Sequence, residues 1–133
     1  MLDTNVLFAG LYSAQGQSHR LLRAIFGKQV RMVISTPLLF EYEDVLKRSQ
    51  MELGLSEADI DAVLDNLCSV AHFQAIYFLW RPCLSDAKDD MVLELAVAAR
   101  APRLVTFNSR DFVPASRFGV SVVSPRQLLE DLK

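Results

Sequence analysis

The sequence lacks the features of secreted, zinc-binding and membrane-spanning proteins. Its two cysteines, Cys68 and Cys83, lie far apart and outside any CxxC spacing, which argues against a disulfide framework and a zinc site. It shows no signal peptide with a basic start and an apolar stretch. No apolar run approaches the ~18 residues of a membrane span. We therefore expect a soluble protein of the reducing cytoplasm, without a membrane partner.

The sequence also lacks the excess of positive charge that is typical of nucleic-acid binders. Its 14 lysines and arginines stand against 16 aspartates and glutamates, a formal net charge of −2, which argues mildly against that class. The objection weakens if several acids gather in one metal site, because the cation would cancel their charge locally. With 51% hydrophobic and 23% charged residues, residues 1–133 are expected to form one compact domain.

Short strand-like runs alternate with longer apolar patterns of helical spacing. Strands are expected over residues 30–35, 73–80, 103–107 and 120–123, and residues 2–8 are expected to be a strand end that continues into a loop. Helices are expected over residues 18–26, 36–48, 56–71, 85–100 and 126–132. Ser18 and Thr36 are interpreted as caps, Gly27 as a helix stop, and Ser56 with Asp59 as a capping box. Such alternation predicts an α/β protein with a mainly parallel sheet flanked by helices, whose ligands bind beyond the carboxyl ends of the strands.

Acidic residues occur at several predicted strand-to-helix junctions. They are Asp3, Glu41, Asp86, Asp89, Asp90 and Asp111. Asp111 and the nearby Asn108 both follow the strand expected over residues 103–107. In a parallel sheet these junctions gather on one edge. Each acid also has a simpler explanation, since acids in a first helical turn are favoured by capping and by the helix dipole. Only Asp3 resists that explanation, because its neighbours are apolar and burying an unpaired acid is costly.

A shared pocket would make these carboxylates repel one another unless they are protonated or hold a divalent cation. Oxygen ligands without histidine or cysteine select Mg2+ or Mn2+ over zinc. Such ions in carboxylate sites act on phosphate oxygens and activate water. The residues therefore suggest phosphodiester hydrolysis.

Four segments, LDTNV, STPLLFEYEDVL, DAKDDMVLELAVAA and LVTFNSRDF, occur in the order expected of PIN domains. The chain most resembles the PIN-family toxins of bacterial toxin–antitoxin systems, the VapC-type ribonucleases. The resemblance implies a PIN-like fold, an RNA substrate, an antitoxin partner and assembly as a homodimer or larger oligomer. It also implies that Asp3, Glu41 and Asp89 hold the catalytic Mg2+ or Mn2+.

The resemblance leaves some positions of the site open. Asp86 lies near Asp89 in the same motif, and Asp90 competes with Asp89 for the ligand position. The family pattern T-x-D reads Thr106-Phe107-Asn108 here, so Asn108 or Asp111 fills the fourth position. By the same resemblance, Thr4, Asn5 and Thr106 are supporting residues that orient the first acid. Family members usually carry a few more residues before that acid, and here only Met1 and Leu2 precede it.

Two other functions stay open on the sequence alone. LDTNV is similar to the opening of HAD-like phosphatases, in which Asp3 would be the nucleophile. That mechanism requires a second aspartate two residues later as general acid, and this chain has Asn5 there. A PIN-like module that binds RNA or protein with a weak catalytic site is the other alternative, favoured by Asn108.

Separately, Arg20, Arg23, Lys28 and Arg31 bracket the first predicted helix. They fit a phosphate-contacting face, although cations near helix ends are common.

Overall fold

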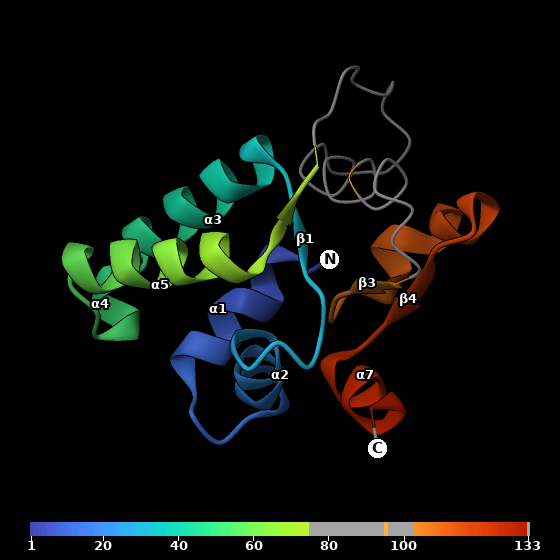
Figure 1. The fold of residues 1–133 in the computed structure, drawn as a ribbon, viewed down its shortest axis with the longest axis horizontal. Helices are drawn as coiled ribbons and strands as arrows, with labels where there is room; N and C mark the ends of the chain where they lie inside the picture. Colours follow the sequence, from blue (N-terminus) through green and yellow to red (C-terminus); the bar gives the residue numbers. More distant parts are fainter. Residues whose placement is uncertain (75–94, 96–102, 133) are drawn as a thin grey trace.

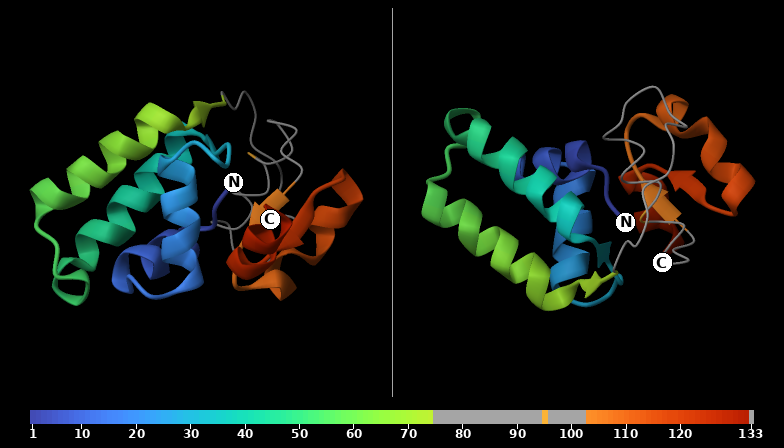
Figure 2. Two further views of the ribbon diagram at one scale, coloured as in Figure 1. Left: turned by 60° about the horizontal axis from the view of Figure 1, so that its bottom comes forward. Right: turned by 90° about the horizontal axis from the view of Figure 1, so that it is seen from above.

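The computed structural model describes residues 1–74, 95 and 103–132. The described residues form two parts that lie side by side, with the N-terminal residues between them (Figures 1 and 2). The first part holds α1 Thr4–Tyr12, α2 Gln17–Phe26, β1 Val33–Ile34, α3 Thr36–Arg48, α4 Gln50–Leu53, α5 Glu57–Val70 and β2 His72–Phe73. The second holds β3 Arg103–Val105, the 3-10 segment η1 Ser109–Phe118, β4 Ser121–Val123 and α7 Pro125–Asp131.

Of the strand end and loop expected over residues 2–8, the structure has the strand end only as a bridge at Leu2, and the expected loop is wrong. Leu2 alone forms a bridge, parallel to Val105, and α1 begins two residues later at Thr4. The run from Val6 to Leu11 is nearly all apolar, and a short apolar run cannot be assigned to strand or helix by its period. The helix forms because Val6 and Leu7 can both be fully buried on it. Asp3 is consequently the residue at which the chain changes from extended to helical.

Serine caps and prolines set most of the expected helix starts. Ser56 and Ser124 each form a full capping box, with Asp59 and Gln127 as the third helical residues. For α3 the cap is Ser35, whose hydroxyl accepts from the N–H of Leu38 at 3.2 Å, one residue earlier than expected. The expected cap by Ser18 is also wrong. Gly16 occupies that position before α2, and Ser18 is buried within the first turn.

All β-pairing among the described residues is parallel. β1 pairs with β2, joining Ile34 to Phe73, and β3 pairs with β4 over three residues each. β3 and β4 were expected as consecutive strands, and the 3-10 segment η1 supplies the crossover that makes them parallel. The strands are shorter than expected, and the described residues contain two separate two-stranded sheets. The rest of the expected strand 73–80, after Gln74, lies outside the described residues. The expected helix 85–100 also lies outside them, apart from Leu95.

One hydrophobic core joins α1, α2, α3, α5 and the second part of the fold. Its fully buried side chains include Leu7 of α1, Leu21 of α2, Ile60 of α5 and Leu104 of β3. α1 and α2 approach closely at Gly10, where an added Cβ would lie 2.4 Å from Leu22 Cδ1. In the part of the chain that the structure describes, no helix has the length and apolar character to span a membrane.

Candidate functional site

Asp3 is held in place by an isolated β-bridge at the residue before it, Leu2. The backbone N–H of Asp3 donates to the carbonyl of Val105 at 2.9 Å, and the N–H of Val105 donates to the carbonyl of Met1 at 2.9 Å. Leu2 lies between these two bonds with 2% of its surface exposed. A single bridge onto β3 therefore fixes the backbone at Asp3, at the carboxyl end of that strand and at the start of α1.

Tyr42 fastens the same segment from the other side. Its buried hydroxyl donates a 2.6 Å hydrogen bond to the carbonyl of Leu2, so α3 is connected directly to the residue before Asp3. Burial raises the pKa of Tyr42 well above its ordinary value, and the negative charge of Asp3 raises it further. The phenol therefore stays protonated and keeps donating. The sequence pattern placed Tyr42 among inward-facing residues without a role, although a buried tyrosine hydroxyl usually needs a partner.

The carboxylate of Asp3 is buried, with 5% of the residue exposed. Thr106 Oγ1 donates to Asp3 Oδ2 at 2.6 Å. Asp3 makes no capping hydrogen bond to α1, yet the nearby N–H groups of Thr4 and Asn5 favour its charge. Burial outweighs these effects and raises the pKa of Asp3 above its usual 3.8, and the charge of Asp111 raises it further. Among the described residues no basic side chain forms an ion pair with Asp3.

Residues 106–111 form a hydrogen-bonded loop beside Asp3. Thr106 continues β3, and its N–H donates to the carbonyl of Val123 at 2.9 Å. Its hydroxyl also accepts from the N–H of Asn108 at 3.0 Å, and the N–H of Asp111 donates to the carbonyl of Asn108 at 3.0 Å. Residues 107–111 line a surface pocket of about 390 Å³. The loop therefore places an exposed Asp111 near enough to Asp3 for the two charges to repel.

The structure brings together some of the predicted site residues. Asp3, Thr106 and Asp111 interact as described above, and Asn108 takes part through its backbone. Glu41 is half-buried on α3, one residue before Tyr42. Thr4 is buried and Asn5 is exposed. The remaining predicted ligands, Asp86, Asp89 and Asp90, lie outside the described residues.

The chemistry of the described donors fits a hard divalent cation, although they do not make a complete site. Asp3 and Asp111 offer carboxylate oxygens, and their mutual repulsion is what a cation between them would relieve. Within residues 1–74, 95 and 103–132, however, no three acidic, histidine or cysteine side chains lie close enough together to hold an ion. A complete metal site therefore requires further ligands beyond those that the described residues bring together.

Comparison with known families gives one match. A family model described as PIN domain matches residues 1–110 of the 133, a range that includes Asp3, Glu41 and Thr106 and ends just before Asp111. No curated protein and no solved structure gave a significant match.

Proposed function

Since the chain belongs to the PIN-domain family, we propose that it is a metal-dependent endoribonuclease that hydrolyses RNA phosphodiester bonds. PIN domains are generally metal-dependent nucleases, so membership makes this chain a nuclease-type domain. The choice of RNA as substrate and of Mg2+ or Mn2+ as the ion belongs to the proposal. Membership of the PIN-domain family also argues against the HAD-like phosphatase alternative, which belongs to a different fold family.

The observation that carries the proposal is a buried carboxylate without a cationic partner among the described residues. Asp3 is held by the backbone of β3, its oxygen is oriented by Thr106, and Asp111 repels its charge. An arrangement with these features destabilises the protein when empty, and it is retained where a cation or a substrate uses it. The buried acid is therefore better explained as part of a functional site than as part of the core.

In the proposed site, Asp3, Glu41 and Asp89 would hold the ion, with Asp86 or Asp90 and with Asp111 assisting. A bound Mg2+ or Mn2+ would neutralise charge on the phosphate and make water a better nucleophile. The remaining work falls to residues of this chain. Thr106 orients Asp3 Oδ2 and favours its charged form, while Tyr42 holds the residue before Asp3 in place. Thr4 and Asn5 favour the charged form through their N–H groups.

RNA cleavage by the purified protein tests this proposal. A labelled single-stranded RNA is incubated with Mn2+ or with EDTA, and the variants are Asp3→Asn, Thr106→Val and Asp65→Asn, an exposed acid on α5. We expect cleavage only with Mn2+, loss of cleavage in Asp3→Asn, and a reduction of ~10–100-fold in Thr106→Val, the usual effect of removing a partner that orients a metal ligand. Asp65→Asn should cleave like the wild type.

Equal cleavage by Asp3→Asn and the wild type would contradict the assignment of Asp3. Absence of cleavage by the folded wild type, with Mn2+ and several RNAs, would instead favour the alternative of a catalytically weak module that binds RNA or protein.

We further propose that the enzyme is the toxin of a toxin–antitoxin pair, blocked by an antitoxin and assembled as a homodimer. The four sequence segments that resemble this branch of the PIN family support it. Growth arrest on induced expression of the wild type, relieved by Asp3→Asn, is the expected result. Normal growth with full RNA-cleaving activity in the same cells would contradict the toxin role.

A further inference from the structure

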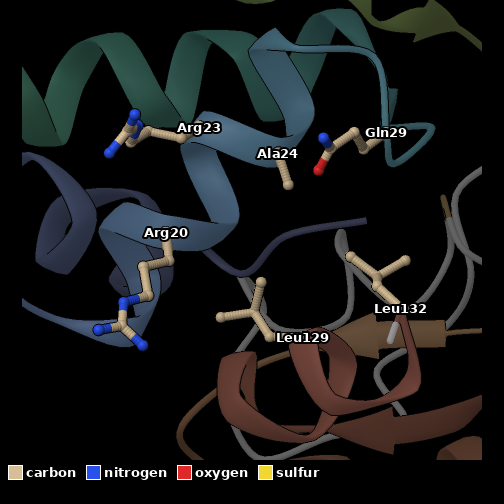
Figure 3. A pocket seen from close by; sticks show the side chains of 6 residues that line it. All are labelled: Arg20, Arg23, Ala24, Gln29, Leu129 and Leu132. Atoms are coloured by element: carbon tan, nitrogen blue, oxygen red, sulfur yellow. The ribbon is translucent and has the colours of Figure 1, made fainter.

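We propose that a basic groove between α2 and α7 is a second RNA-binding surface, which contacts the phosphate backbone away from Asp3. The groove is lined by Arg20, Arg23, Ala24, Gln29, Leu129 and Leu132 and has a volume of about 470 Å³ (Figure 3). This proposal rests on the proposed function, because that function supplies RNA as the polyanion.

The first observation is the uneven distribution of charge along an acidic chain. Residues 4–40 contain no aspartate or glutamate, while they include Arg20, Arg23, Lys28 and Arg31. All four side chains are exposed. Since the whole chain has a net charge of −2, α2 and the loop after it form a positive region on an otherwise acidic molecule.

The second observation is that these cations have no acidic partners among the described residues. Elsewhere among the described residues, several cations lie within ion-pair distance of carboxylates: Lys47 with three acids, Arg48 with Asp44, and Arg126 with Glu130. Within the described ranges, no carboxylate forms an ion pair with Arg20, Arg23, Lys28 or Arg31. Their charge is therefore available to an external anion.

The third observation is the mixed lining of the groove. Arg20 and Arg23 are three residues apart on α2, so they share a helix face. Figure 3 shows both guanidinium groups toward one end of the groove and Gln29 toward the other, with Leu129 and Leu132 facing α2 from α7. Guanidinium groups pair with phosphates through two parallel hydrogen bonds. A positively charged groove that follows the backbone is one of the features with which proteins hold a single strand of nucleic acid.

The groove is separate from the proposed catalytic site. β4 is parallel to β3, and α7 follows β4 and runs back along the strands, so that Asp131 near its end pairs with Arg103 at 3.4 Å. Leu129 and Leu132 therefore lie toward the amino end of β3, whereas Asp3 and Thr106 lie at its carboxyl end. One RNA must be long enough to reach both places, so the groove contacts phosphates other than the one that is cleaved.

Binding without catalysis tests this surface directly. Fluorescence anisotropy measures the affinity of the full chain, in EDTA, for a labelled single-stranded RNA of about 20 nucleotides, longer than the ~4–16 nucleotides of typical single-strand sites. The test variant is Arg20→Gln with Arg23→Gln. The control is Lys47→Gln with Arg48→Gln, which removes the same charge from the end of α3, outside the lining of the groove. Thermal melting of both verifies that they are folded.

We expect the test variant to bind at least about 10-fold more weakly than the control. Two lost phosphate contacts should also reduce the slope of log Kd against log salt concentration by about 1.4, at roughly 0.7 per contact with a single strand. Equal affinity and equal slope in the two double variants would overturn the proposal, and the basic face would then serve a different anionic partner. With Mn2+, the defect should appear in KM and should be larger for long RNAs than for short ones.

The two proposals fail in different ways. If the wild type does not cleave RNA with Mn2+ but the EDTA affinity still depends on Arg20 and Arg23, the RNA-binding surface is supported and the nuclease assignment is wrong. If the wild type cleaves RNA and the two double variants bind it equally, the nuclease assignment is supported and the RNA-binding surface is wrong.

Discussion

At the scale of single residues, the central feature is the conflict between the burial of Asp3 and its charge. Burial alone favours the protonated acid, whereas the hydrogen bond from Thr106 and the start of α1 favour the carboxylate. Tyr42 lies close enough to Asp3 for the charge of the carboxylate to raise the pKa of the Tyr42 hydroxyl. Without a bound ion, the net result of these effects is a raised pKa for Asp3. At a pH above that pKa, the ionised Asp3 lowers the stability of the folded state.

This balance predicts the pH dependence of stability without divalent ions. The pKa of Asp3 is raised above 3.8 in the folded state, so the unfolded chain releases this proton at a lower pH than the folded one. The folding contribution of Asp3 is therefore most favourable below about pH 3.8 and declines as the pH rises through the folded pKa. Asp3→Asn has no such proton, so its melting temperature relative to the wild type should increase between about pH 4 and 7. Melting curves in EDTA measure this difference, and a difference that decreases over that range would contradict the raised pKa.

At the scale of secondary-structure elements, the N-terminal segment is fixed by what surrounds it. It receives a bridge from β3, a hydrogen bond from α3 and the start of α1 within four residues. The helices were the more predictable elements, because caps such as Ser56 and Ser124 are local chemistry. The helix that begins at Thr4 was not predicted, since whether an apolar run becomes strand, loop or helix depends on distant partners such as Val105 and Leu22.

Tyr42→Phe tests the connection between α3 and the N-terminal segment. The change removes a hydroxyl of 0% exposure and leaves the carbonyl of Leu2 without this 2.6 Å donor. An unsatisfied buried acceptor costs ~1–3 kcal/mol, so the free energy of unfolding should decrease by about that amount. Because Asp3 follows Leu2, RNA cleavage should decrease as well, and chemical denaturation with cleavage assays measures both. Unchanged stability would show that the hydrogen bond has no net effect.

Gly10→Ala tests the contact between α1 and α2. The new methyl group would lie 2.4 Å from Leu22 Cδ1 and 3.0 Å from the carbonyl oxygen of Ser18. Overpacking of this kind costs ~1–3 kcal/mol, which exceeds the ~0.5–1 kcal/mol that alanine gains over glycine within a helix. Gly16→Ala is the control, because its nearest contact is 4.0 Å away. Urea denaturation should show a loss of stability for Gly10→Ala alone, and an equally stable Gly10→Ala would contradict the close approach.

At the scale of the whole molecule, a nuclease-type domain with an acidic net charge has a long segment, residues 4–40, whose charged residues are all cationic. Asp3, Thr106 and Asp111 were proposed as site residues from junction positions and from the resemblance; the structure places them near one another, and their role in a metal site stays a prediction. Tyr42 was missed because its spacing is that of an ordinary core residue. The groove was not foreseeable, since its two walls, α2 and α7, are about a hundred residues apart in the sequence.

Titration calorimetry of Mn2+ into the protein tests the central claim, that buried Asp3 is kept for a divalent cation. We expect Mn2+ binding by the wild type, binding weakened at least ~10-fold by Asp3→Asn, and normal binding by Asp65→Asn, because Asp3 is a proposed ligand and Asp65 is not. Raising the pH through the folded pKa of Asp3 should strengthen binding by the wild type, since the ion competes with a proton. Equal Mn2+ affinity for the wild type and folded Asp3→Asn would contradict the claim.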